Sequence, residues 1–324
     1  MSVVLGSWSH FLSHLLPKMA ILAQKFARQQ GFNAQYLRRY RLWPRPDASF
    51  GARELRRMQD YALQFVVFFA EVVSVWRGSP LRDRERERLT AFAAMLCLYD
   101  DFFDQPHRSE AEIWAFIAQP EQFRARNARE AVALALWQRL KADLPHPAAF
   151  YPAFQEFHQA QVASQAQAGG HHLPRAQIQK ISFDKGGQAL VLSWLLLDHA
   201  RLLQEQAAVY QLGAWFQILD DIVDVAKDHA EGIATLVTTA PTLEAVQEDL
   251  EAQTRVAFSA LQGLPYPAER LRQARDFSWS SAQVARPTCN FSNPNKPYLL
   301  SNPMPSPLTC WPGMSAAGKT SGTV

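Results

Sequence analysis

Apolar residues recur at spacings of three and four from Phe11 to about Arg275, and no stretch alternates apolar and polar residues between turn signals. This pattern predicts an all-α protein. Glycine and proline predict breaks at residue 31 and at residues 44–51, 78–80, 105–106, 145–147, 169–170 and 263–267. Between these breaks the pattern predicts long helices at residues 52–77, 82–104, 128–142, 148–168, 175–200, 204–230 and 243–262.

The chain divides into a helical domain and a tail. Residues 1–285 form the predicted domain, whereas residues 286–324 hold seven prolines, many Ser and Asn residues and no helical period. The most apolar runs, 65–76 and 189–197, are short or interrupted by Glu71 and Asp198, which predicts buried helices rather than membrane spans. The first twenty residues have no basic segment ahead of their apolar part, so they make a poor signal peptide.

The composition limits the possible binding partners and the cellular compartment. A 324-residue chain that is 48% hydrophobic can bury a large core. Its formal charge of +3 and its lack of a nucleic-acid module pattern argue against nucleic-acid binding. Residues 25–60 carry nine Lys or Arg against three acids, a local excess that fits either a solvated face or contact with lipid headgroups or a diphosphate. Three cysteines without paired spacing predict no disulfide framework and a reducing cytoplasm.

Two aspartate clusters inside apolar segments carry the chemistry. Asp100-Asp101-Phe102-Phe103-Asp104 and Asp220-Asp221-Ile222-Val223-Asp224 lie 220 − 100 = 120 residues apart, and Asp228 continues the second cluster by one turn. Residues four apart share a helix face, so each cluster gathers carboxylates along one stripe. Carboxylates this close repel unless a cation compensates them, and oxygen ligands favour Mg²⁺ or Mn²⁺.

These motifs resemble the class I isoprenoid synthase family, which includes polyprenyl diphosphate synthases, squalene and phytoene synthases, and terpene cyclases. The first cluster is similar to the DDxxD motif. The second, with Phe216 and Gln217, is similar to the FQxxDDxxD motif of chain-elongating prenyltransferases, and positions 220, 224 and 228 have the register of the second cyclase metal motif. The resemblance covers about residues 50–265. It implies an antiparallel helical bundle around a central apolar cavity.

The resemblance also implies an activity. Such enzymes ionise an allylic prenyl diphosphate with Mg²⁺, in this case three ions bridging both clusters and the diphosphate. The implied metal ligands are Asp100, Asp101, Asp104, Asp220, Asp221, Asp224 and Asp228, and the implied catalytic residues are Asp100, Asp220 and Lys185. Lys185 precedes Gly186 and Gly187, which we expect to let its helix kink toward the ligand. The implied substrate-binding residues are Lys185, Arg108, Lys227, Phe103, Phe216 and Gln217.

A hydrocarbon wall is expected below the metals, because aromatic faces stabilise carbocations. Its candidates can equally be ordinary core residues: Phe92, Leu96, Phe102, Phe103, Phe183, Leu190, Trp194, Trp215 and Phe216. Cys97 is expected to be a small core residue. Gln161 and Gln165 share one helix face, which is expected to be an exposed amide stripe, with a position facing the cavity as the alternative.

Several alternatives stay open at the level of sequence. The reaction is chain elongation, head-to-head condensation or cyclisation. The region before residue 77 has no clear Gly-Lys with paired arginines, which argues against elongation. The second motif has no Arg-x-Tyr companion, which argues against head-to-head condensation. A non-catalytic lipid-binding or partner subunit of the same fold is a further alternative, as are peripheral membrane contact and a homodimer. A di-iron bundle is disfavoured because no Glu-x-x-His occurs.

Overall fold

Helices make up every regular element that the structure describes. The computed structural model describes residues 16–40, 47–104, 108–169, 173–198 and 203–285, and no strand occurs within these ranges. The all-α prediction is therefore confirmed. The predicted tail, with Cys289 and Cys310, lies outside the described residues.

The helices follow the predicted spans closely, with four additions. They are α2 Leu16–Leu37, α3 Ala52–Phe65, α4 Glu71–Arg77, α5 Asp83–Tyr99, α6 Asp101–Asp104, α7 Glu110–Ala118, α8 Ala128–Lys141, α9 Pro147–Ser164, α10 Arg175–Trp194, α11 Leu203–Val223, α12 Val225–Glu231, α13 Leu243–Gln262 and α14 Ala268–Ala285. Short turns η2 Arg38–Tyr40 and η4 Gln165–Gln167 extend α2 and α9, and a π-helical turn, η3 Val66–Ala70, joins α3 to α4. The sequence predictions did not include α2, α7, α14 or the π turn.

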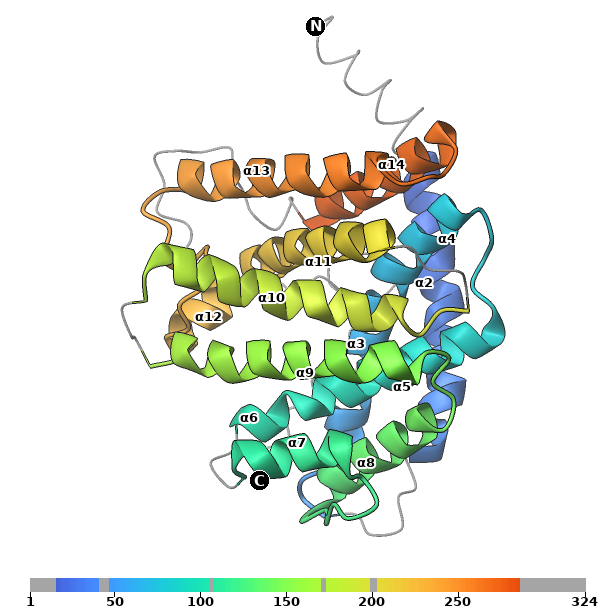
Figure 1. Ribbon diagram of the computed structural model, residues 1–324, viewed down its shortest axis with the longest axis vertical. Helices are drawn as coiled ribbons and strands as arrows, with labels where there is room; N and C mark the ends of the chain where they lie inside the picture. The colour runs from blue at the N-terminus through green and yellow to red at the C-terminus, as the bar shows by residue number, and fades with distance from the viewer. Residues whose placement is uncertain (1–15, 41–46, 105–107, 170–172, 199–202, 286–324) are drawn as a thin grey trace, which may run out of the picture.

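The helices form two packed groups. Helices α9, α10, α11 and α13 lie side by side in that order and alternate in direction (Figure 1). Helices α2, α3, α5 and α8 form the second group, with α3 and α8 both against α5, and α14 covers α4. Since neighbouring helices in a bundle pack through their apolar faces, the core lies between the two groups.

Local sequence signals explain where several helices begin and end. Ser109 and Glu112 form a reciprocal cap at the start of α7, and Asn127 and Thr242 cap α8 and α13 with their side-chain oxygens. Gly78 ends α4 at a φ of 70°, a left-handed conformation that glycine adopts without steric cost. The Ser-x-x-Glu pattern at 109–112 is thus the signal from which α7 was predictable.

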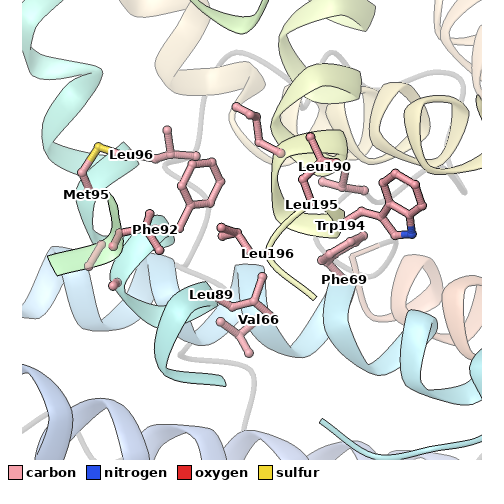
Figure 2. Packing of buried hydrophobic residues seen from close by; sticks show 14 of the residues in the cluster. Val66, Phe69, Leu89, Phe92, Met95, Leu96, Leu190, Trp194, Leu195 and Leu196 are labelled. Carbon is pink, nitrogen blue, oxygen red and sulfur yellow. The ribbon is translucent and has the colours of Figure 1, made fainter. Parts of the chain in front are cut away.

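Helix α5 is the centre of the core. Every residue from Arg88 to Tyr99 is buried. Figure 2 shows Leu89, Phe92 and Leu96 of α5 facing Val66 and Phe69 of the π turn, with Leu190 and Trp194 of α10 close by. Cys97 is a buried free thiol, which confirms it as a small core residue.

The run Ala52–Arg77 is long and apolar enough to cross a membrane by length and composition alone. Its most apolar window has a mean hydropathy of 1.3, and 59% of that window is buried inside the protein. Val72, Val73 and Trp76 are fully buried. The predicted burial of this segment is confirmed, and its apolar character is accounted for by the core.

The break predicted at Gly31 is wrong, whereas the kink predicted at Gly186 and Gly187 stays a prediction. Helix α2 runs straight through Gly31, where a break was expected, because a lone glycine lowers helix stability without ending the helix. Helix α10 also continues through Gly186 and Gly187. These residues allow close helix contact: a Cβ on Gly186 would lie 2.6 Å from the Gly213 carbonyl oxygen, and one on Gly213 would lie 2.4 Å from the Gly186 oxygen.

The glycines provide a matched pair of stability predictions. We expect Gly213→Ala to lower the free energy of unfolding by about 1–3 kcal/mol, because α10 and α11 must move apart. Gly31→Ala should raise it by about 0.5–1 kcal/mol, since its added Cβ meets no atom within 4 Å. Urea unfolding followed by circular dichroism measures both. Equal effects of the two substitutions would contradict the assigned α10–α11 contact.

Candidate active site

The first aspartate cluster lies where α5 ends. Asp100 caps α5, its N–H bonding to the Leu96 carbonyl at 3.0 Å, and Asp101 begins the short helix α6. The predicted single helix 82–104 is thus interrupted inside the cluster. Of Asp104 only the backbone position is described, so its predicted role as a metal ligand lies outside the described side chains.

Asp101 is held by two arginines. Arg57 of α3 lies 2.5 Å from one of its carboxylate oxygens, and Arg129 of α8 lies 3.1 Å from the same oxygen. Arg57 also donates to the Cys97 carbonyl at 3.0 Å. These ion pairs connect α6 to α3 and α8 and compensate the charge of Asp101, whose role as a metal ligand stays a prediction.

Asp100 points toward α9. The Gln161 side-chain amide donates to its Oδ1 at 2.5 Å, and Gln161 is only 3% exposed. The expected exposed amide stripe is therefore wrong at Gln161, although Gln165 is exposed and donates to the Phe103 carbonyl. A buried amide that orients a carboxylate fixes which of its oxygens remains available.

The second cluster lies at the end of α11. Gln217 donates to Asp221 Oδ1 at 2.9 Å and to Asp220 at 3.4 Å, one turn before the cluster. Helix α11 ends at Val223 and α12 begins after Asp224, which has φ −89° and ψ 4°. Backbone bonds from Asp224 to Asp220 and from Asp228 to Asp224 continue across this break, so the three aspartates keep neighbouring positions.

The carboxylates of the second cluster are desolvated and repel one another. Burial, followed by the charge of Asp224, raises the pKa of Asp220 to about 6, and burial with Asp224 raises that of Asp228 to about 6. Burial raises the pKa of Asp221 to about 7, with further increases from Asp220 and Asp228. Asp221 is the more enclosed of the two neighbours, at 4% exposed, whereas Asp220 is exposed to solvent. The Oδ2 atom of Asp221 is buried without a hydrogen-bond partner.

Two lysines partly offset this charge. Lys185 of α10 is half-buried, and its charge lowers the pKa of both Asp220 and Asp221. Lys227 of α12 lies 3.6 Å from Asp224 and acts on Asp220 and Asp228. Both predicted cations are therefore beside the second cluster. Lys185 is the more enclosed of the two, since the Lys227 side chain is 61% exposed.

Tyr61 of α3 links the two clusters in space. Asp100 and Asp220 both act electrostatically on its hydroxyl and, together with burial, raise the pKa of Tyr61 well above its usual range. The Tyr61 side chain is nevertheless 37% exposed. The charges of the first aspartate of each cluster therefore both reach one accessible phenol.

Arg108 is paired within the protein. Its guanidinium makes a two-pronged ion pair with Glu130, at 2.9 and 2.6 Å, and donates to the Arg124 carbonyl at 2.8 Å. It also lies 4.3 Å from the centre of the Phe123 ring. These contacts connect the start of α7 to α8, and substrate binding by Arg108 stays a prediction.

The predicted wall residues divide by burial. Six of them are buried in the core, which is compatible with either role: Phe92, Leu96, Phe102, Leu190, Trp194 and Trp215. Phe103, Phe183 and Phe216 are only partly buried. Phe216 faces Phe68 of the π turn at 6.4 Å between ring centres, and Phe103 contacts Tyr99 and His158.

The sequence did not predict the roles of four residues near the clusters. Arg57, Arg129 and Gln161 bind carboxylates of the first cluster, and Tyr61 is affected by the charges of both clusters. Arg57 and Tyr61 are four residues apart, which places them on one face of the predicted helix 52–77, a signal that was available. No periodicity identifies Arg129 or the burial of Gln161, because both depend on contacts between distant helices. Within the described residues, no group of three or more His, Cys, Asp or Glu side chains is placed to hold a metal ion by itself.

The raised pKa values predict a pH-dependent stability. Folding raises the pKa of Asp220, Asp221 and Asp228 above the ordinary 3.8, so the folded metal-free protein binds protons more tightly than the unfolded chain. This stabilisation is fully present below about pH 4 and is lost as the pH rises through about 6–7. We expect the Tm of metal-free protein to fall across this window, and Mg²⁺ to raise the Tm more at about pH 8 than at about pH 5.

The matched variant is Asp221→Asn, which removes the most deeply buried charge. It should stabilise the metal-free protein at about pH 8 by on the order of 1–3 kcal/mol and flatten the pH dependence. Thermal unfolding with and without magnesium chloride measures both effects. A Tm that rises with pH through this window, or an unchanged slope in Asp221→Asn, would contradict the described electrostatics.

Comparison with known proteins assigns the chain to no family. No protein-family model matches the sequence, and no curated protein matches it. The functional interpretation therefore rests on the residues of the two clusters and on their arrangement.

Proposed function

We propose that the protein is a Mg²⁺-dependent enzyme of the isoprenoid synthase type that ionises an allylic prenyl diphosphate. The observation that carries this proposal is the pair of aspartate clusters 120 residues apart in sequence, whose first members, Asp100 and Asp220, both act electrostatically on Tyr61. Cations held by the two clusters would neutralise a diphosphate bound between them.

The donor set fits a hard divalent cation. The Asp220, Asp221, Asp224 and Asp228 carboxylates repel one another and lack full compensation, and Asp221 Oδ2 is a buried oxygen without a partner. Mg²⁺ is usually held by one or two carboxylates, with waters and substrate phosphates completing its coordination. The lack of a ready-made group of three ligands among the described residues is compatible with this mode of binding. When bound, magnesium supplies positive charge against the departing pyrophosphate.

The chain's own residues then have separate tasks. Lys185 adds a fixed positive charge beside Asp220 and Asp221, where it can bind a phosphate oxygen as the C1–O bond breaks and the electron pair leaves with pyrophosphate. Gln161 and Gln217 orient the Asp100 and Asp221 carboxylates. In this proposal Asp101 keeps its two arginines and helps to hold the first cluster in place.

The proposal predicts magnesium-dependent release of pyrophosphate. The purified protein is incubated with geranyl, farnesyl or geranylgeranyl diphosphate, each with and without isopentenyl diphosphate, and products are identified by mass spectrometry. Longer diphosphates formed only with isopentenyl diphosphate would establish elongation, whereas hydrocarbons or alcohols from the allylic substrate alone would establish cyclisation or condensation. No release from any substrate would overturn the proposal in favour of a non-catalytic subunit.

Charge-removing variants test the clusters directly. We expect Asp100→Asn and Asp220→Asn each to lower kcat about 100-fold or more, because each removes negative charge needed to hold cations against the diphosphate. Asp249→Asn is the control, since Asp249 pairs with Arg175 at the α10–α13 contact. Retention of full activity in both cluster variants would contradict the assignment.

Lys185 has its own prediction and a control on the same helix. Lys185→Ala should raise the KM for the allylic diphosphate about 10-fold, the effect of losing a charge-assisted phosphate contact. Lys180→Ala should leave KM unchanged, because the Lys180 side chain is 76% exposed and pairs with Asp184. Steady-state kinetics of the two variants decides between a substrate contact and an ordinary lysine at position 185.

A further inference from the structure

Tyr61 is unusual among the aromatic residues of the described helices. With 37% of its surface exposed, it is one of three exposed large hydrophobic residues, beside Ile21 and Val256. Its neighbours Met58, Ala62 and Leu63 are buried against the core. The protein therefore keeps accessible one large ring that the charges of both acidic clusters reach.

An aromatic stripe continues from Tyr61 along the same face. Phe65 stacks on Tyr61 at 6.0 Å with an interplanar angle of 16°, and it meets Phe92 of α5 edge-on at 6.3 Å. Phe68 lies 6.4 Å from Phe216 of α11. Spacings of four and seven residues place Tyr61, Phe65 and Phe68 on one helix face, and both phenylalanines are only half-buried.

The π turn contributes to this arrangement. Phe68 is the partly buried member of η3, whereas Val66, Val67, Phe69 and Ala70 are buried. A π turn is wider than an α-helical turn and is frequently found at functional sites. It leaves Phe68 facing Phe26 and Phe216 while its neighbours fill the core.

The same face changes character along its length. Arg57, one turn before Tyr61, holds Asp101 of the first cluster, whereas Phe65 and Phe68 follow on the other side. The order along α3 is therefore a cation, a phenol and then hydrocarbon rings. A ligand with an anionic head and an apolar chain matches this order, with Tyr61 at the junction of its two parts.

Resting on the function proposed above, we propose that Tyr61 contacts the substrate at this junction: its hydroxyl donates a hydrogen bond to a diphosphate oxygen, and its ring, continued by Phe65, flanks the first isoprene unit. The hydroxyl stays protonated at neutral pH, because burial and the carboxylates of Asp100 and Asp220 raise the pKa of Tyr61. A neutral phenol can donate to an anion without adding negative charge between the clusters.

Two substitutions separate the hydroxyl from the ring. Tyr61→Phe removes the donor and keeps the ring, whereas Tyr61→Leu removes both. The control is Tyr36→Phe, which removes a buried hydroxyl that accepts a bond from Arg139 of α8. Circular dichroism of each variant confirms that the helices are retained.

Titration calorimetry of the full chain with Mg²⁺ gives a readout that does not require turnover. The probes are inorganic pyrophosphate and a prenyl thiodiphosphate, in which sulfur replaces the bridging oxygen at C1. We expect Tyr61→Phe to weaken binding of both probes about 10-fold, since a charge-assisted hydrogen bond is lost. Tyr61→Leu should weaken binding of the prenyl probe by about a further 10-fold, because its ring contact is lost as well. Tyr36→Phe should bind both probes like the wild type.

The outcomes distinguish this proposal from the proposed function. If the wild type binds both probes with Mg²⁺ and the Tyr61 variants bind them equally well, the role of Tyr61 is overturned and the proposed function stands. If the wild type binds neither probe, both proposals fail together. Equal weakening by Tyr36→Phe would assign the effect to general destabilisation and would also overturn the role of Tyr61.

Discussion

The close contact between α10 and α11 is the constraint on which the second acidic cluster depends. Gly186 and Gly187 of α10 meet Gly213 of α11 nearly backbone to backbone, and a Cβ on Gly186 would also lie 2.7 Å from the Gln217 Cβ. The missing side chains leave room for Gln217, which donates to Asp221, and they place Lys185 where its charge reaches Asp220 and Asp221. The glycines thus allow the close packing of α10 on α11, and this packing positions Gln217 and Lys185 beside the second cluster.

The first cluster is built differently. Asp100 and Asp101 follow the buried segment Arg88 to Tyr99 of α5, and the arginines of α3 and α8 hold Asp101 in place. The two clusters therefore have different electrostatic surroundings. Asp101 is compensated by protein, whereas burial and mutual repulsion raise the pKa values of Asp220, Asp221 and Asp228. Compensation by an added cation is therefore needed most at α11 and α12.

Helix α3 connects these features to the apolar core. Its buried face packs on α5, and its other face carries Arg57, Tyr61 and Phe65 past both clusters. The π turn after it directs Phe69 into the core and Phe68 toward Phe216. One helix therefore contributes at once to the stability of the bundle, to the neutralisation of Asp101 and to the surface proposed to contact substrate.

The sequence by itself determined the all-α class, most helix positions and the two aspartate clusters, because helical periodicity and carboxylate spacing are local properties of the chain. It also identified Lys185, Lys227 and Gln217, which the structure places beside the second cluster. Tertiary structure alone decided that Arg108 pairs with Glu130, that Asp101 is held by arginines and that Gln161 is buried against Asp100. It also decided that Gly186 and Gly187 form a helix contact and that the charges of both clusters act on Tyr61. Each of these outcomes depends on which distant helices pack together, and the pattern of residues along the chain does not contain that information.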